Sequence, residues 1–286
     1  MGDVIVQGVC LGGIYALLAL GFSIVFHSSL VLNLAYGAQI TIVAYTVWDL
    51  TASAGLPTWA AVLIVIVLSV ILALVLERVF IRPIQRRDLI SIVVATLMLA
   101  TLMRAIGILI WGGQSRAYPF TPSGFYEFGP IRVLPAYLYA FVGALLVFVL
   151  LFGFFRCTKA GLGMRIVANN PVVAQSMGIK VRQLIQLSWV ASGLFAAMSA
   201  VLIGMTNMVT PYMDFLVLGK ALPVLLVGGL FSLPGALVGG LFIGVAETVG
   251  GHYYQGYDTM IPWACMLLIL LTRPWGLLGK PLARRI

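Results

Sequence analysis

The chain has 286 residues, of which 62% are hydrophobic and 9% are charged, and its mean hydropathy is +1.11. This composition excludes a water-soluble domain, and several runs of about 20 apolar residues have the length of bilayer-crossing helices. The net charge of +9 comes from basic residues in short loops beside these runs, where they set orientation, so we expect no nucleic-acid partner.

The apolar runs predict an all-α, polytopic helical membrane protein with one transmembrane domain over residues 1–286. Helices are expected because backbone groups in lipid must be satisfied within the segment. The predicted segments are 4–26, 31–49, 57–77, 89–111, 134–155, 184–206, 216–230, 232–250 and 259–272. Pro and Gly interrupt 216–250, which fits either two crossings or one crossing plus a re-entrant hairpin. We therefore expect eight or nine membrane segments, some of them broken.

Basic residues gather in the 78–88 loop, the 156–183 stretch and the C-terminal tail, which all fall on one side of this topology. The positive-inside rule makes that side cytoplasmic. The opposite side has five acidic residues, Asp3, Asp49, Glu127, Asp214 and Asp258, and only Arg116 and Arg132 as basic ones. The longest outside loop, 112–133, is either part of an external mouth or a structured connector.

Three charged residues, Arg104, Lys220 and Glu247, fall within the predicted spans. Each lies near a helix end, and for Arg104 and Lys220 we expect either a structural role or snorkelling to the interface. They form no evident proton relay, which argues against proton-coupled transport.

No pattern of catalytic or metal-binding residues is present in the sequence. Cys10, Cys157 and Cys265 are far apart, and His27 and His252 lie near opposite membrane faces. Phosphate-binding loops and hydrolase motifs are missing as well. We therefore expect no enzyme activity, no metal site and no cofactor bound by this chain.

Small residues recur at the spacing that allows close helix contact. The pairs are Gly8/Gly12, Gly235/Gly239 and Gly240/Gly244, and Ser192, Ala196 and Ala200 form a similar stripe. The small-residue helices at 4–26 and 184–206 run in opposite directions in the predicted topology. This arrangement predicts an inverted repeat, which in transporters places a substrate site between the halves.

The 156–183 stretch is basic, has no acidic residue and carries its own helix boundaries. Asn170 can cap a helix, Pro171 suits its first position, and Gly178 supplies a left-handed stop that Ile179 can cover. The pattern predicts a short ordered helix at the membrane surface. It is either a docking element for another protein or an incidental helix in a solvated basic loop.

Two motifs resemble the inner-membrane permeases of branched-chain amino acid ABC transporters, the LivH type. The first is GLGMRIVANNPVVAQSMGIKV, from Gly161 to Val181, and the second is KALPVLLVGGLFSLPGALVGGLFIGVAE, from Lys220 to Glu247. GGIYALLALGFSIVF after Cys10 and the late TRPWGLLG are also similar. The chain departs from the family pattern after its first helix, where Tyr36-Gly37-Ala38 lacks the usual His and Glu, and at Phe231.

The resemblance implies one membrane subunit of an importer that forms the pathway for branched-chain or related amino acids or another small polar solute. Its expected partners are a second permease subunit, identical or different, two cytoplasmic ATPases that use ATP, an external substrate-binding protein and membrane lipid. The expected location is a bacterial-type inner membrane. The residues that would couple to the ATPase are Arg165, Asn170, Pro171, Val172, Val173, Ala174, Met177, Gly178 and Ile179.

Polar groups and helix breaks at membrane depth indicate where a translocation pathway would run. The candidates are Tyr15, Asn33, Tyr36, Gly37, Gln39, Gly228, Gly229, Pro234 and Gly235. A structural alternative is that Asn33 and Gln39 bond across helices and that the glycines allow close packing. The rival function is a self-sufficient secondary transporter or channel, and the sequence leaves the substrate open among amino acids, urea and short amides.

Overall fold

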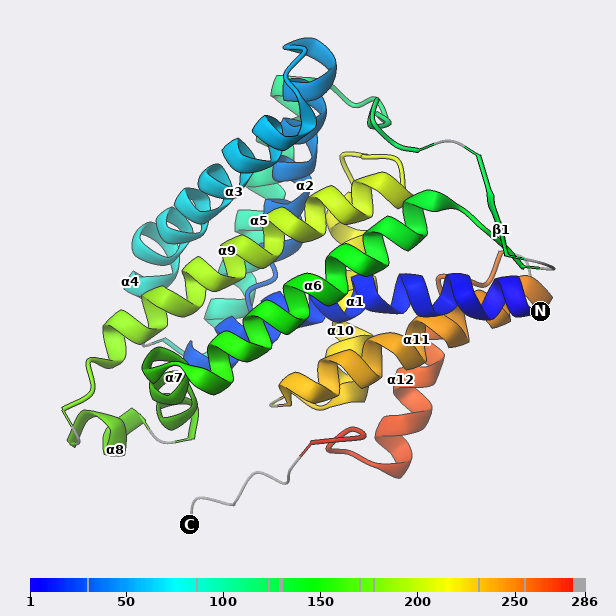
Figure 1. The fold of residues 1–286 in the computed structure, drawn as a ribbon. Coiled ribbons are helices and arrows are strands. Elements are labelled where there is room, and N and C mark those ends of the chain that lie inside the picture. The colour runs from blue at the N-terminus through cyan, green and yellow to red at the C-terminus, as the bar shows by residue number, and fades with distance from the viewer. Residues whose placement is uncertain are drawn as a thin grey trace. The chain divides into compact units, whose positions relative to one another are not determined.

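The computed structural model describes residues 1–29, 31–85, 87–122, 124–128, 131–169, 171–176, 178–230, 232–254 and 256–279 (Figure 1). The chain divides into two compact units. Unit 1 comprises Met1–Ser23, Pro122–Leu145 and Gly219–Ile286, and unit 2 comprises Ile24–Thr121 and Leu146–Leu218. Of the sequence features noted above, Phe231 and residues 280–286 of the basic tail lie outside the described part.

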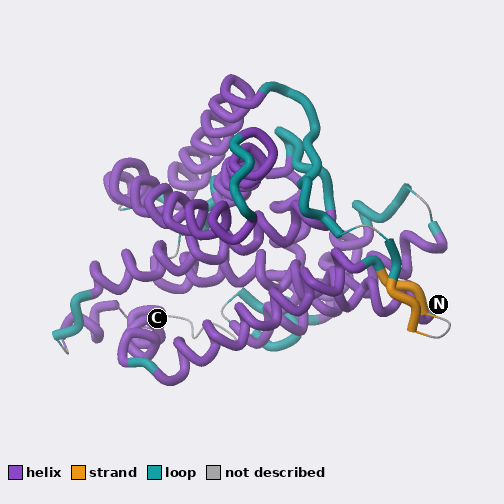
Figure 2. Tube along the Cα trace, turned by 45° about the horizontal axis from the view of Figure 1, so that its top comes forward, coloured by secondary structure: helices purple, strands orange, loops and turns teal. Residues whose placement is uncertain are grey.

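Helices dominate the structure (Figure 2). The α-helices are α1 (Gly2–Ser29), α2 (Tyr36–Trp48), α3 (Thr58–Val75), α4 (Arg82–Ile84), α5 (Leu89–Trp111), α6 (Pro135–Cys157), α7 (Lys159–Asn169), α8 (Pro171–Ser176), α9 (Val181–Thr206), α10 (Met213–Gly228), α11 (Leu233–Tyr253) and α12 (Ile261–Thr272). Two π-helical turns, η1 (Asp49–Ser53) and η2 (Leu76–Ile81), extend α2 and α3. The strands β1 (Tyr126–Phe128) and β2 (Ile131–Val133) pair antiparallel.

Each of the nine predicted segments contains a helix, which confirms a polytopic helical membrane protein. In the described part of the chain, six helices are long and apolar enough to cross a membrane: Gly2–Ser29, Thr58–Ile84, Ile90–Trp111, Pro135–Phe154, Val181–Thr206 and Leu233–Tyr253. The helices α2, α10 and α12 have 13, 16 and 12 residues. These three are shorter than the about 20 residues that a perpendicular crossing requires.

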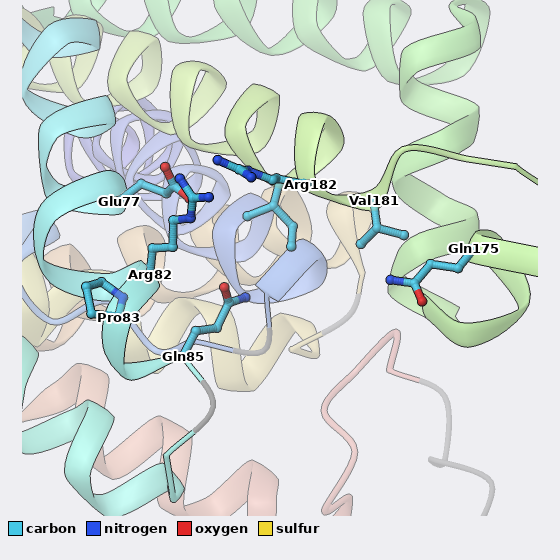
Figure 3. Close-up of a pocket in the computed structure, with 8 residues that line it drawn as sticks. Glu77, Arg82, Pro83, Gln85, Gln175, Val181 and Arg182 are labelled. Atoms are coloured by element: carbon cyan, nitrogen blue, oxygen red, sulfur yellow. The ribbon is translucent and has the colours of Figure 1, made fainter.

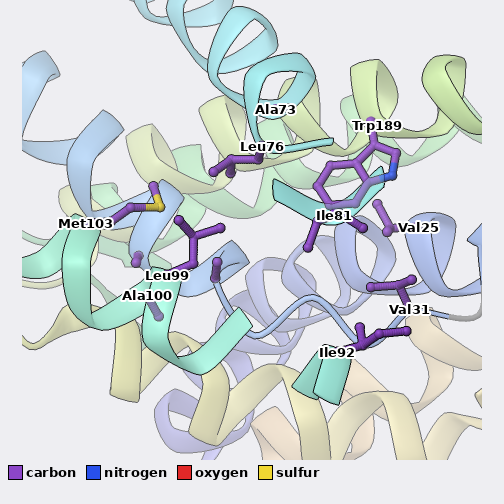
Figure 4. Close-up of a cluster of buried hydrophobic side chains, with 12 residues drawn as sticks. Val25, Val31, Ala73, Leu76, Ile81, Ile92, Leu99, Ala100, Met103 and Trp189 are labelled. Carbon is purple, nitrogen blue, oxygen red and sulfur yellow. The ribbon is translucent and has the colours of Figure 1, made fainter. Parts of the chain in front are cut away.

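The core of unit 2 is built where α2, α3, α5 and α9 pack together. Gly193 of α9 allows the closest approach, because a Cβ added there would lie 2.9 Å from the carbonyl oxygen of Ser69 in α3. At one end of these helices Trp189, Leu76 and Met103 belong to a cluster of buried apolar side chains (Figure 4). The cluster joins segments far apart in sequence into one packed body.

Helix α5 begins where the sequence predicts, because Asp88 caps it. The Asp88 carboxylate accepts the Ser91 hydroxyl at 2.8 Å and the Ser91 backbone N–H at 3.1 Å. These hydrogen bonds, the one from the hydroxyl first, hold the pKa of this exposed carboxyl below its usual value. The negative charge also complements the positive end of the helix dipole.

Unit 1 is held together by the glycine pairs of α1 and α11. A Cβ added at Gly12 would lie 2.7 Å from the Cα of Leu241 and 2.8 Å from the carbonyl oxygen of Gly240. A Cβ at Gly8 would lie 2.7 Å from the Cα of Val245. The prediction that GxxxG pairs allow close helix contact is therefore confirmed for Gly8/Gly12 and Gly240/Gly244, which meet each other.

The 112–133 loop contributes residues to both units, and in each unit the described residues of the loop are held by hydrogen bonds. In unit 2, Tyr118 is buried and donates its hydroxyl to the carbonyl oxygens of Ala44 and Ala200, at 3.2 and 3.1 Å. In unit 1, the two strands lie beside the N-terminus, where the Arg132 backbone N–H donates to the Asp3 carboxylate at 3.0 Å (Figure 2). This loop is a structured connector along its described length.

Candidate functional site

The basic stretch 156–183 is more helical than the sequence predicts. We expected a loop that carries one short helix, but α6 continues to Cys157, α7 covers Lys159–Asn169 and α9 starts at Val181. Helix α7 packs on α9 through Gly163, where an added Cβ would lie 2.8 Å from Leu184. The expectation missed α7 because its two glycines suggest a loop, whereas tertiary packing against α9 stabilises the helix.

The short helix predicted after Asn170 is present as α8, and its stop is confirmed. Gly178 has a φ of +76°, and its N–H donates to the Gln175 carbonyl at 3.0 Å. The Ile179 N–H donates to the Ala174 carbonyl at 3.0 Å, which completes a Schellman motif. Such a stop fixes where the helix ends and directs the chain into α9.

The predicted coupling residues are placed unequally. Pro171, Val172, Val173 and Ala174 lie in α8, with Ala174 buried, and Arg165 lies in α7. Gly178 and Ile179 form the stop, while Asn170 and Met177 lie outside the described residues. The coupling role of these positions stays a prediction.

Asn33 lies in the non-helical segment between α1 and α2, since α2 starts at Tyr36 and not near residue 31 as predicted. The side chain is buried, and neither amide atom has a hydrogen-bond partner among the described residues. Burying an unpartnered amide costs free energy. Asn33 therefore contributes no bond to the packing described here, unlike most buried amides.

Gln39 has the structural role that we considered as an alternative. Its Nε2 donates to the carbonyl oxygen and the hydroxyl of Ser69, at 3.0 and 3.2 Å. The Ser69 hydroxyl in turn donates to the Gly193 carbonyl at 2.8 Å. This chain of hydrogen bonds links α2, α3 and α9 within unit 2.

Arg104 and Asp214 form a buried ion pair that the sequence did not reveal. The guanidinium Nε donates to both carboxylate oxygens at 3.2 Å, and Nη2 contacts Oδ2. The ring of Phe215 lies 4.3 Å from the guanidinium carbon. The Asp214 side chain is 1% exposed and belongs to α10, not to the loop where the sequence placed it. For Arg104 the pair shows the structural one of the two expected roles.

The pairing of Asp214 also explains Gly37. A Cβ added at Gly37 would lie 2.7 Å from the Asp214 carbonyl oxygen, so only glycine lets the start of α2 approach the start of α10 this closely. Tyr36, beside it, is fully buried. Gly37 and Tyr36, two of the pathway candidates, are therefore packed inside the protein at the start of α2.

A second buried ion pair lies in unit 1. Lys220 in α10 donates to Glu247 Oε1 in α11 at 2.7 Å, and the Tyr15 hydroxyl donates to the same oxygen at 3.1 Å. The other oxygen, Oε2, has no partner among the described residues. Both charged side chains are at most 10% exposed, so Lys220 has the structural one of its two expected roles.

Hydrogen bonds satisfy backbone groups at the break between α10 and α11. Gly229 has a φ of +106°, Pro234 lies in the first turn of α11, and the Ser232 hydroxyl accepts the Gly235 N–H at 3.0 Å. The N–H groups of Leu277 and Leu278 donate to the carbonyls of Val227 and Gly228, at 2.7 and 3.2 Å. The late TRPWGLLG motif thus caps α10, which satisfies the carbonyls that a helix end leaves free.

The nine predicted pathway residues divide between the two units. Unit 1 holds Tyr15, Gly228, Gly229, Pro234 and Gly235, and unit 2 holds Asn33, Tyr36, Gly37 and Gln39.

The signal that would have revealed the ion pairs is charge matching, since each intramembrane cation requires an anion. Sequence separations of 110 and 27 residues hide that match.

The chain resembles proteins of known type along most of its length. The profile of a family described as branched-chain amino acid transport system / permease component matches residues 4–270. The high-affinity branched-chain amino acid transport system permease protein LivH of Escherichia coli K12 is 27% identical, and the alignment covers 98% of this chain and 96% of the relative. For BraD of Pseudomonas aeruginosa, also named a permease protein, the identity is 28% and the coverages are 99% and 97%.

An archaeal relative and one solved structure extend the comparison. A probable branched-chain amino acid transport permease protein LivH of Methanocaldococcus jannaschii is 27% identical over 92% of this chain and 88% of its own. A chain in the structure of PsaBC from Streptococcus pneumoniae in complex with Fab superposes with a TM-score of 0.53. It is 13% identical and covers 93% of this chain and 89% of its own, a likeness that concerns the fold alone.

Proposed function

The chain belongs to the family of permease components of branched-chain amino acid transport systems, and on that premise we propose that it is a membrane subunit of an ATP-binding cassette importer. The observation that carries the proposal is the family match over residues 4–270, together with relatives named as permeases over nearly the whole chain. The substrate is an amino acid, branched-chain or related, or a similar small polar solute. A second permease subunit, two ATPases and an external binding protein complete the transporter.

The coupling element in this proposal is α8. The Schellman motif gives α8 a defined end, and the neighbouring helix α7 packs on α9. A displacement of α8 would therefore be transmitted to α9, a long membrane helix, through the short segments that connect these helices. Gln175 and Ser176 are exposed on α8, while Ala174 is buried. ATP-driven closure of the partner ATPases would then move these helices and switch access across the membrane.

Each unit contains its own candidate pathway groups. Asn33 offers a buried amide without a partner among the described residues, which is the chemistry that a polar solute could satisfy. Tyr15 lies beside the Lys220–Glu247 pair, and the Gly228–Gly235 break interrupts the helices of unit 1. Eight or nine crossings arranged as an inverted repeat are part of this proposal.

A self-sufficient secondary transporter would require a free carboxylate to couple an ion gradient. Glu247 is the carboxylate that the rival function would need in unit 1, and Lys220 pairs with it at 2.7 Å. The formal charges of the pair cancel, which supports an energy source outside the chain.

The decisive experiment is co-purification from membranes with the candidate ATPase. The wild type is expected to retain the ATPase, and a Pro171→Gly/Val173→Asp double variant in α8 is expected to lose it while the permease stays folded. Ala54→Asp, at an exposed site between η1 and α3, serves as the matched control and should retain it. Retention by the α8 variant, or transport by the reconstituted chain alone down an ion gradient, would contradict the proposal.

A further inference from the structure

A cavity of about 560 Å³ lies within unit 2, where η2 and α4 meet the start of α9 and the end of α8 (Figure 3). Arg82, Arg182, Gln85 and Gln175 provide its polar groups, and Pro83, Val181 and Ile185 provide its apolar wall. Figure 3 shows Arg82 and Arg182 extending into this region from two different helices. The cavity contains none of the proposed pathway residues, and Gln175 is its one lining residue in the proposed coupling helix α8.

Neither arginine of the cavity forms an ion pair within the described part of the chain. No ion pair joins Arg82 or Arg182 to a carboxylate of the described residues, which include all eight acidic residues of the chain. Glu77 also lines the cavity, is 3% exposed, and its Oε2 has no hydrogen-bond partner among those residues. Two guanidinium groups and one carboxylate leave a formal charge of +1, which matches one singly charged oxyanion.

The depth of the cavity is that of lipid headgroups. The apolar helix Thr58–Ile84 has 27 residues and so extends about 40 Å, against a hydrocarbon core of about 30 Å. Arg82 lies at its end, and Arg182 lies at the start of α9, the neighbouring membrane helix. Both arginines therefore lie at the surface of the membrane, whichever side this end faces.

An apolar track leads away from the cavity along the same helix. Exposed apolar side chains on α3 and η2 include Ile64, Val67, Leu68, Ile71, Val75 and Val79. Their three- and four-residue spacing forms one stripe on a membrane-spanning helix, where an acyl chain would lie. A polar headgroup site at the end of a helix that carries an exposed apolar stripe offers both kinds of surface that a phospholipid needs.

We propose that this cavity binds the phosphodiester headgroup of a membrane phospholipid, with its acyl chains along α3. Arg82 and Arg182 hold the phosphate oxygens, since guanidinium groups recognise phosphate with paired hydrogen bonds. Gln85 and Gln175 donate amide N–H groups to the same headgroup. Because Gln175 belongs to α8 and Arg182 to α9, the bound lipid ties these helices to the membrane surface.

The test is native mass spectrometry of the full-length protein in neutral detergent with added phosphatidylglycerol. The wild type is expected to retain one lipid, and Arg82→Gln/Arg182→Gln to weaken retention by about tenfold or more, since each lost charged hydrogen bond is worth roughly that factor. The single Arg182→Gln variant, at an exposed position that folding tolerates, should show part of this loss.

Three controls test whether lipid retention depends on the cavity arginines, on the acyl chains alone or on the headgroup alone. Arg78→Gln/Arg87→Gln removes two exposed cations from the same region that do not line the cavity, and should leave retention unchanged. Diacylglycerol supplies chains without phosphate, and glycerophosphoglycerol supplies the headgroup without chains. Equal retention by wild type and the Arg82/Arg182 variant, an equal loss in the control variant, or retention of diacylglycerol would overturn the proposal. Competition by glycerophosphoglycerol at the lipid's own concentration would assign the site to a free anion and overturn it too.

Discussion

At the scale of single residues, four membrane-buried charged groups compensate one another in two ion pairs. Lys220 pairs with Glu247, and Arg104 pairs with Asp214, each pair formed within one unit. Removing one partner of such a pair leaves an uncompensated buried charge, whereas removing both leaves none. The two pairs are therefore structural constraints as well as candidates for roles in transport.

The Lys220–Glu247 pair gives the first prediction. Lys220→Met is expected to lower the free energy of unfolding by about 3–5 kcal/mol, because Glu247 is then buried without its cation. The Lys220→Met/Glu247→Met double variant should recover most of that loss. Unfolding in detergent, followed by intrinsic fluorescence, measures both.

The control for this prediction is the exposed Arg132–Glu127 pair, whose side chains are 71% and 62% exposed. Arg132→Gln should change the free energy of unfolding little, since solvent screens exposed pairs. A Lys220→Met variant as stable as Arg132→Gln would refute the buried-pair argument.

Asn33 gives the second prediction. Replacing its unpartnered amide by the similar-sized Leu should raise the free energy of unfolding by about 1–3 kcal/mol, the cost of a buried unsatisfied group. Solute uptake should fall in the same variant if the amide serves the pathway. The measurements are unfolding in detergent and uptake by the reconstituted transporter.

Gln39 provides the matched amide for comparison. Gln39→Leu should destabilise the protein, because Gln39 bonds Ser69 across two helices. Unchanged uptake in Asn33→Leu would remove Asn33 from the pathway.

At the scale of the elements, glycine decides which helices touch. The pairs Gly8/Gly12 and Gly240/Gly244 let α1 and α11 approach until backbone meets backbone. Gly193 does the same between α9 and α3. The recurrence of small residues is visible in the sequence, but the sequence does not say which pairs meet.

The third prediction compares two helical glycines. Gly12→Ala should lower the free energy of unfolding by about 1–3 kcal/mol, because the new methyl would overlap the backbone of α11. Gly107→Ala in α5 has open space around it and should raise stability by up to about 1 kcal/mol through helix propensity. If both variants lose stability equally, the close contact of α1 and α11 is not what makes Gly12 necessary.

At the scale of the whole molecule, orientation connects the fold to function. The proposed topology places α8 and the 78–88 loop in the cytoplasm, where ATPases act, and the turn between η1 and α3 outside. The prediction concerns single cysteines placed in a variant without Cys10, Cys157 and Cys265. A membrane-impermeant thiol reagent should label Ser176→Cys only in inverted vesicles and Ala54→Cys only in right-side-out vesicles. If each cysteine is labelled from the side opposite to the expected one, the topology is the reverse of the proposed one. If both are labelled from the same side, the number of membrane crossings between residues 54 and 176 differs from the proposed number.

Much of the architecture is predictable because membrane helices obey a local rule. A segment apolar for about 20 residues must satisfy its own backbone, so all nine predicted segments contain helices. The stop at Gly178 is local too, since a left-handed residue and two backbone hydrogen bonds suffice. Helix α7 and the start of α2 at Tyr36 were missed because packing against other helices decides them.

The sequence by itself determined the class of the protein, the nine segments that contain helices, the glycine stop of α8 and the resemblance to a permease family. Each depends on composition or on residues close together along the chain. Only the tertiary structure decided that Lys220 pairs with Glu247, that Arg104 pairs with Asp214, that Gln39 bonds Ser69 while Asn33 has no described partner, and that Arg82 and Arg182 line one cavity. These outcomes depend on distances between helices remote in sequence, which packing sets and no local pattern encodes.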